Sequence, residues 1–202
     1  MKNLMMGAVC TAVLLSTSAA MAKAVVGQPA PTFTATDAAG KAVALSDFKG
    51  KFVVLEWTNP GCPFVGKHYD SGNMPVTQKD AMAKGVTWLS IQTTALNWRA
   101  DNTRAELQAW QKSKNAAPTA AIVDAGGKIA TSYQAKATPH MYVVDPQGTL
   151  IYAGAIDSKP TSNPADIKTA TNYVAQALSE AMAGKPVSRP VTQAYGCSVK
   201  YF

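Results

Sequence analysis

Apolar and polar positions follow two different rhythms in the first third of this chain. Near its start, PTFTATDAAGKAVALSDFKGK alternates apolar and polar residues on both sides of Asp37-Ala38-Ala39-Gly40, which is typical of a β-hairpin. The next segment, FVVLEW (residues 52–57), is almost continuously apolar and has the length of a strand. This pattern favours a central strand buried on both faces. Pro60 and Gly61 then end the strand, and Pro63 suits the first position of a helix.

The remaining pattern predicts strands and helices in turn. A helix near 75–84 leads to the apolar strand VTWLSIQTT, and a capping box, Thr103-x-x-Glu106, predicts that another helix starts in TRAELQAWQKSKN. AAIVD and MYVVD are predicted strands, and LIYAGAID pairs with MYVVD as a second hairpin. A last helix is expected from about Pro164 to Gly184. Strands alternating with helices predict an α/β domain, with a largely parallel central sheet and an antiparallel hairpin at its edge.

Two glycines and a lysine follow the AAIVD strand after Ala125, and a phosphate-binding loop would need such glycines directly before a helix. We place Gly126-Gly127-Lys128 in a hairpin turn rather than before a helix. On that interpretation the segment is no phosphate-binding loop.

The first 22 residues have the composition of a targeting segment. MKNLMMGAVCTAVLLSTSAAMA carries one lysine near its start, an apolar middle and small residues at Ala20 and Ala22, which predicts a secretory signal peptide cleaved after Ala22. The protein is then periplasmic or secreted. The segment is too short and too rich in Ser and Thr for a stable membrane span, so we expect no stable membrane insertion after its removal. The predicted divisions after it are one domain over residues 23–185 and a tail over residues 186–202.

The charge of the chain is basic but unpatterned. The formal net charge is +7, and the lysines are scattered without a basic run or an interleaved aromatic ladder. We interpret them as a solvated surface and expect no nucleic-acid partner.

Removal of residues 1–22 leaves two cysteines, Cys62 and Cys197. Cys62 lies where a buried strand ends and a helix begins. Free N–H groups and the positive end of the helix dipole stabilise a thiolate there, so Cys62 is the candidate reactive thiol. We expect Gly-Cys-Pro at this junction to leave the sulfur exposed. The other interpretation of Cys62 is a buried structural cysteine.

Three motifs in order resemble one family. They are FTATDAAGKAVALSDFKGK, VVLEWTNPGCPF around Cys62, and ATPHMYVVDPQG. Together they are similar to thioredoxin-like redoxins, in particular the alkyl hydroperoxide reductase/thiol-specific antioxidant (AhpC/TSA) group, from about Gly27 to Lys185. The resemblance implies a thioredoxin-like fold, with a mixed central sheet flanked by helices, and thiol-based redox chemistry. That chemistry needs no bound organic cofactor.

The chain departs from the family pattern at the active site. Val65 stands where thioredoxins have their second cysteine, and Asn59 stands where peroxiredoxins have a threonine, three residues before the thiol. The peroxiredoxin arginine position falls on Pro139. Thr138-Pro139 instead matches the cis-proline that lies beside the active sulfur in thioredoxins.

The resemblance also suggests roles for Glu56 and His140. Thioredoxins hold a buried acid six residues before the thiol, the position of Glu56, where a raised pKa allows proton transfer. The alternative is a glutamate at the strand end that reaches solvent or meets Lys51 or Lys67. His140 follows Pro139 and is either a proton carrier near Cys62 or a surface histidine. We do not assign His68 to the site, because it falls on another face of the helix from Cys62. Arg99 is the one arginine considered for anion or peroxide contact.

Cys197 lies in an apolar segment, AYGCSVKYF, that we expect to dock on the domain. It is either a resolving thiol that condenses with oxidised Cys62, one end of a permanent disulfide, or unpaired. The leading hypothesis is therefore an exported thiol oxidoreductase that reduces hydroperoxides or exchanges disulfides with proteins or small thiols, using an external thiol as electron donor.

Two alternatives to an enzyme remain. One is a copper-binding module on the same fold, with Cys62, His140 and Met141 as soft ligands. The other is a redox-silent fold held by a Cys62–Cys197 disulfide.

Overall fold

The computed structural model describes residues 23–94, 100–116 and 118–200. The predicted signal peptide and Arg99 lie outside the described residues. Within them no helix is both long enough and apolar enough to cross a membrane.

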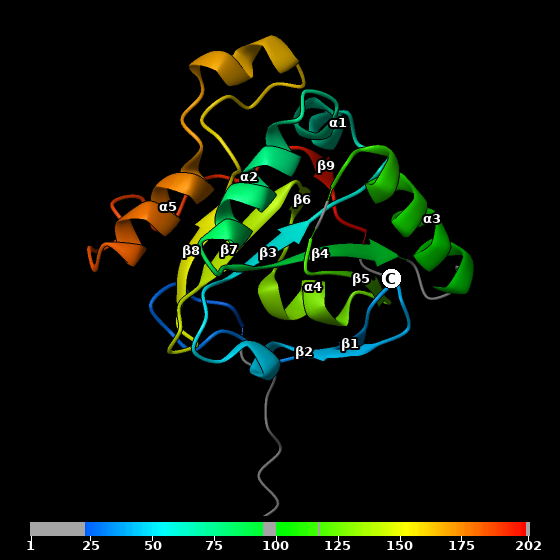
Figure 1. The fold of residues 1–202 in the computed structure, drawn as a ribbon, viewed down its shortest axis with the longest axis horizontal. Coiled ribbons are helices and arrows are strands. Elements are labelled where there is room, and N and C mark those ends of the chain that lie inside the picture. Colours follow the sequence, from blue (N-terminus) through cyan, green and yellow to red (C-terminus); the bar gives the residue numbers. More distant parts are fainter. Residues whose placement is uncertain (1–22, 95–99, 117, 201–202) are drawn as a thin grey trace, which may run out of the picture.

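A mixed sheet of five strands forms the centre of the fold (Figure 1). The strand order is β5 (Ala120–Ala125), β4 (Thr87–Thr94), β3 (Val53–Trp57), β7 (His140–Val144) and β8 (Leu150–Gly154). The neighbours β5, β4 and β3 are parallel, whereas β7 is antiparallel to both β3 and β8. The predicted central strand and second hairpin are confirmed. The first hairpin is also confirmed, as β1 (Thr34–Thr36) and β2 (Ala42–Ala44), followed by the 3-10 turn η1 (Leu45–Phe48).

Side chains of β3 alternate between two apolar layers. Val53, Leu55 and Trp57 pack in the layer that contains α4 (Lys128–Tyr133). Val54 belongs to the opposite layer, with side chains of α1 (Pro63–Asp70), α2 (Asn73–Ala83) and α5 (Tyr173–Met182). Because α3 (Ala100–Ser113) brings Trp110 against this second layer, four helices cover one face of the sheet and the short α4 covers the other.

Three sequence predictions about helices were wrong. The capping box at Thr103 does not start its helix, since α3 already begins at Ala100. Gly126 and Gly127 do not form a hairpin turn, because Gly127 is the N-cap of α4. The single helix expected from Pro164 is two elements, the 3-10 helix η2 (Pro164–Thr169) and α5. Asn172 separates them by accepting a hydrogen bond from the Ala175 amide, which starts a new helix.

The start of α4 is closed to an anion even though glycines precede it. Asp124 at the end of β5 accepts hydrogen bonds from the backbone N–H groups of Ile129 and Ala130, at 3.1 and 2.9 Å. The carboxylate of the protein itself therefore occupies the first turn. The conclusion that this segment is no phosphate loop stands, but for a different reason from the one predicted.

The tail after α5 returns across the domain instead of leaving it. Ser188 bonds Glu180 of α5, and the amide of Ala153 in β8 donates to the carbonyl of Pro190. The tail ends as strand β9 (Cys197–Ser198), paired with the short strand β6 (Ala137–Thr138). Figure 1 shows β9, in red, directly below α1 and near the arrowhead of β3. Cys62 is the N-cap of α1.

Candidate active site

Cys62 is the N-cap residue of α1, directly after the loop that leaves β3. Pro63 occupies the first helical position, as predicted. Proline is tolerated there because the N–H group it lacks would have no hydrogen-bond partner within the helix. Cys62 is not exposed as expected, since only 2% of its surface is accessible. The tail covers the junction that Gly-Cys-Pro was expected to leave open.

Cys62 and Cys197 form a disulfide with a Cα–Cα distance of 5.9 Å. The unpaired interpretation of Cys197 therefore does not hold for this structure. Cys197 is more accessible than Cys62, being partly rather than fully buried.

Backbone pairing brings Cys197 to Cys62. Thr138 and Cys197 are partners in the antiparallel β6–β9 ladder, and Thr138 precedes Pro139 across a cis peptide bond, as the resemblance implied. The carbonyl oxygen of Thr138 lies 3.1 Å from Cys62 Sγ. The disulfide and the Thr138-Pro139 turn thus form one compact site, to which Pro139 contributes backbone shape rather than a reactive group.

Glu56 is fully buried and surrounded by hydrogen-bond donors. Tyr69 donates to Oε1 at 2.6 Å, and Trp88, Gln78 and Ser90 donate to Oε2 at 2.7, 3.1 and 3.1 Å. Burial raises the pKa of Glu56, and these hydrogen bonds oppose the rise. The alternative of a glutamate reaching solvent is wrong, and Lys67 does not pair with it.

The sheet separates Glu56 from His140. Glu56 is paired with Met141 across β3 and β7, so their side chains share one face, whereas Trp57 and His140 share the other. The structure therefore brings together Cys62, Cys197 and Pro139. It does not bring His140 to the same side as Glu56.

His140 is buried rather than on the surface. Its Nδ1 accepts a hydrogen bond from the Lys136 amide at 3.2 Å, so the neutral ring carries its proton on Nε2. The Tyr142 hydroxyl lies 3.1 Å from the same Nδ1 and donates to the carbonyl of Tyr133 at 2.9 Å. Burial lowers its pKa to about 4. Because Lys136 precedes β6, His140 fixes the backbone that leads to Thr138. It also lines a cavity of about 480 Å³ beside tail residues 191–194.

Sequence reasoning missed a polar cluster beneath the tail. It consists of Lys67 and His68 of α1, Asp157 after β8, and Tyr195 of the tail. Lys67, His68 and Asp157 are at most 3% exposed. Two adjacent polar residues in one helix gave no signal of burial, because their partners lie about 90 and 128 residues further along the chain.

The copper ligand set is not assembled. His140 and Met141 are neighbours in β7 and point to opposite faces of the sheet. Among the described ranges, no group of three or more His, Cys, Asp or Glu side chains could hold a metal ion.

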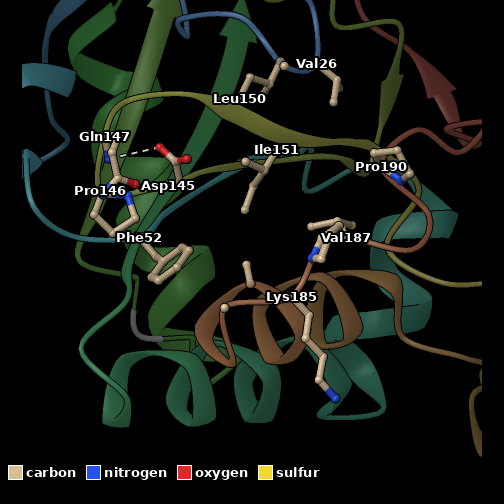
Figure 2. Close-up of a pocket in the computed structure, with 14 residues that line it drawn as sticks. Val26, Phe52, Asp145, Pro146, Gln147, Leu150, Ile151, Lys185, Val187 and Pro190 are labelled. Atoms are coloured by element: carbon tan, nitrogen blue, oxygen red, sulfur yellow. Dashed lines mark hydrogen bonds between the residues drawn. The ribbon is translucent and has the colours of Figure 1, made fainter.

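A second cavity lies away from the disulfide. It has a volume of about 420 Å³ and is bounded by β8, the end of α5 and the start of the tail. Figure 2 shows Phe52, Ile151 and Val187 around it, with the Lys185 side chain extending away. None of the predicted site residues lines this cavity.

Solved structures similar to this chain share its fold. An uncharacterized conserved protein from Geobacillus kaustophilus matches with a TM-score of 0.72 and 24% identity, over 88% of this chain and 93% of that one. A hypothetical protein from Sinorhizobium meliloti matches with a TM-score of 0.72 and 21% identity, over 88% and 95%. The thioredoxin domain of a thiol-disulfide oxidoreductase from Bacteroides vulgatus matches with a TM-score of 0.53 and 21% identity, over 72% and 96%. These likenesses establish a thioredoxin-like fold.

The family comparison goes further than the fold. The model of the AhpC/TSA family matches residues 26–153, which is more than half of the chain and includes Cys62, Thr138 and Pro139. Together with the disulfide at Cys62, this match supports a thiol oxidoreductase in general terms. The chain belongs to the AhpC/TSA family.

Proposed function

We propose that this protein is an exported thiol–disulfide oxidoreductase that cycles between a Cys62–Cys197 disulfide and the dithiol. One observation carries the proposal: Cys62, at the N-terminus of α1 and beside Thr138-Pro139, is bonded to a cysteine on a separately docked tail. A disulfide whose second cysteine lies on a terminal segment can open without disturbing the sheet. The predicted signal peptide supports export to an oxidising compartment.

In the reductive half of the cycle, a donor thiolate attacks Cys197 Sγ. The new bond joins the donor to Cys197, the Cys62–Cys197 bond breaks, and Cys62 leaves as a thiolate. A second donor thiolate then releases Cys197 and yields an oxidised donor pair. Two features support this direction: Cys197 is the more accessible residue of the pair, and Cys62 at a helix N-terminus is the better leaving group.

In the oxidative half, the Cys62 thiolate attacks a disulfide in a protein or small molecule, forms a mixed disulfide and releases one substrate thiol. Cys197 attacks Cys62 of that mixed disulfide, which releases the second substrate thiol and restores the Cys62–Cys197 bond. No cofactor is consumed, and two electrons pass from the donor thiols to the substrate disulfide.

Hydroperoxide reduction is the second candidate, and family membership favours it. Cys62 thiolate would attack the peroxide, forming a sulfenic acid and releasing an alcohol or water. Cys197 would then condense with the sulfenic acid and release water. The departures at Asn59 and Pro139 weigh against this reaction, because the threonine and arginine of typical peroxiredoxins are missing from those positions.

Glu56 and His140 have distinct proposed roles. Glu56 is a proton carrier on the face of the sheet that holds Cys62, supported by its burial and raised pKa. His140 acts indirectly, as a positioning residue for the backbone between Lys136 and Pro139.

The reduction potential of the Cys62–Cys197 couple tests this function. A glutathione titration with mapped, non-reduced peptides should give a potential of roughly −200 mV, in the range of catalytic couples. The dithiol should then be oxidised by a model disulfide, with Cys62→Ser abolishing the reaction. A potential below about −300 mV would identify a permanent structural disulfide and overturn the proposal. Adding a hydroperoxide to the same dithiol separates the two candidate reactions.

A further inference from the structure

The tail is held beside Cys62 by a tyrosine as well as by the disulfide. Tyr195 lies two residues before Cys197, and its hydroxyl donates a hydrogen bond to Asp157 Oδ1. The Nε2 atom of His68 lies 3.2 Å from the same hydroxyl oxygen, and Lys67 Nζ lies 3.4 Å from it. One phenol therefore meets three polar groups of the domain.

The donors and acceptors of this cluster form a consistent chain. Asn73 Nδ2 lies 2.8 Å from His68 Nδ1, and an amide NH₂ can only donate, so the neutral imidazole carries its proton on Nε2. That N–H donates to the oxygen of Tyr195, whose own O–H donates to Asp157. Burial lowers the pKa of His68 to about 4, which keeps the ring in this neutral form.

Lys67 and Asp157 neutralise each other without the tail, but the hydrogen bonds of the cluster are complete only when Tyr195 is docked. Lys67 Nζ forms a buried ion pair with Asp157 Oδ2 at 3.1 Å and donates to the carbonyl oxygen of Lys159 at 2.7 Å. Removal of the Tyr195 hydroxyl takes one of two donors from Asp157 Oδ1, which keeps the Lys159 amide at 3.0 Å, and leaves the His68 N–H without this acceptor. Buried groups that lose a partner are costly, so the cluster favours the docked tail.

Aromatic packing adds to the hydrogen bonds. The Tyr195 ring meets the edge of Phe64 at a centroid distance of 5.9 Å, and Lys67 Nζ lies 5.5 Å from its centre. Phe64 is the second residue of α1, and Cys62 is its N-cap. The tyrosine thus docks on the same helix turn that positions the reactive sulfur.

We infer that Tyr195 is a positioning residue that keeps Cys197 beside Cys62 when the disulfide is open. The inference rests on the proposed function and deepens it. Only Gly196 separates the anchored tyrosine from the cysteine, so the docked phenol restricts Cys197 to the neighbourhood of Cys62 Sγ. A docked tail raises the effective concentration of Cys197 and accelerates closure of the disulfide at the expense of competing thiols.

The test compares Tyr195→Phe with Tyr173→Phe in the full chain. Both substitutions remove one tyrosine hydroxyl, and Tyr173, whose ring lies under Arg189, is not part of the cluster. Equilibration with reduced and oxidised glutathione measures the effective concentration of Cys197 at Cys62. We expect Tyr195→Phe to lower this effective concentration about tenfold, which corresponds to a rise of about 30 mV in the reduction potential. We expect Tyr173→Phe to change the effective concentration by no more than about twofold.

A second measurement uses the unaltered protein. Amide hydrogen exchange of Val199, whose N–H donates to the carbonyl of Lys136, should remain protected after reduction with dithiothreitol. An unchanged effective concentration in Tyr195→Phe, or loss of that protection on reduction, would show that the disulfide alone holds the tail. Neither measurement requires turnover, so failure of the proposed function and failure of this inference give different results.

Discussion

Glu56 is a buried carboxyl group whose surroundings both oppose and support its charge. Burial disfavours the carboxylate, whereas Tyr69, Gln78, Trp88 and Ser90 all donate to it. Burial is the larger effect, so the pKa of Glu56 lies above its usual value of 4.5. In the folded protein this side chain takes up a proton more readily than it does in the unfolded chain.

The pH dependence of stability should reveal this shift. Because the folded-state pKa is raised, the stabilising contribution of Glu56 is complete below its unfolded pKa and is lost as the pH rises through the folded value. Glu56→Gln should therefore gain stability relative to the unaltered protein as the pH rises, by at most about 1.4 kcal/mol per pH unit. Urea unfolding of both oxidised proteins from pH 4.5 to 8 measures the difference.

Glutamine is a suitable replacement because the site can accept it. Its oxygen can take the place of Oε2, where Trp88 and Gln78 require an acceptor, and its NH₂ can face the hydroxyl of Tyr69, which can also accept. His68 and His140, whose pKa values are lowered to about 4, titrate equally in both proteins. Parallel stability curves for the two proteins would refute the raised pKa.

At the scale of elements, the pairing of β6 with β9 depends on Gly196. Its φ is +129°, and a Cβ atom there would lie 2.0 Å from the Thr138 carbonyl oxygen. Gly196→Ala must push β9 away from β6 and should lower the effective concentration of Cys197 at Cys62 about tenfold or more. A glutathione titration gives this quantity.

Gly184→Ala is the matched control for that change. Gly184 also has a positive φ, of +70°, but a Cβ atom there would meet nothing within 4 Å. Gly184→Ala therefore also places an alanine at a positive φ, but its Cβ atom does not collide with a neighbouring segment. Equal effects of the two substitutions on the titration would mean that strain, and not the close approach of β9 to Thr138, controls disulfide closure.

The sequence predicted most elements because their patterns are local. Alternation around Asp37–Gly40 and the apolar run before Cys62 each required burial on defined faces, and both became strands as expected. Residues 128–133, KIATSY, gave no helical signal, because isoleucine, threonine and tyrosine favour strands and six residues are too few to show a period. Burial of Ile129, Ala130 and Tyr133 decides that element.

The candidate site was predictable only where a short motif carried it. Cys62, Glu56 and Pro139 stand in motifs with fixed spacing. The structure places all three at or beside the edge of the sheet where β3 ends and β7 begins. Tyr195 and Asp157 stand in no motif. Their importance arises from a contact between two segments 38 residues apart, which no single-sequence pattern reports.

At the scale of the molecule, the disulfide joins the tail to the domain across a separation of 135 residues. In the chain-entropy model, such a closed loop stabilises the folded state by about 5 kcal/mol, through restriction of the unfolded chain. A catalytic cycle requires that the reduced protein also stay folded. The sheet, α5 and the buried residues of both apolar layers lie within residues 23–185, so we expect the reduced domain to remain folded with a lower free energy of unfolding.

Unfolding the protein in both redox states measures that coupling. Oxidised protein should exceed reduced protein by about 5 kcal/mol, with Cys62→Ser/Cys197→Ser matching the reduced form. By linkage, this free-energy difference equals RT times the natural logarithm of a ratio. The ratio is the effective concentration of Cys197 at Cys62 in the folded state divided by that in the unfolded state, here on the order of 10³–10⁴. A difference near zero would mean that folding does not bring Cys197 to Cys62 more often than the random chain does, which would contradict a docked tail.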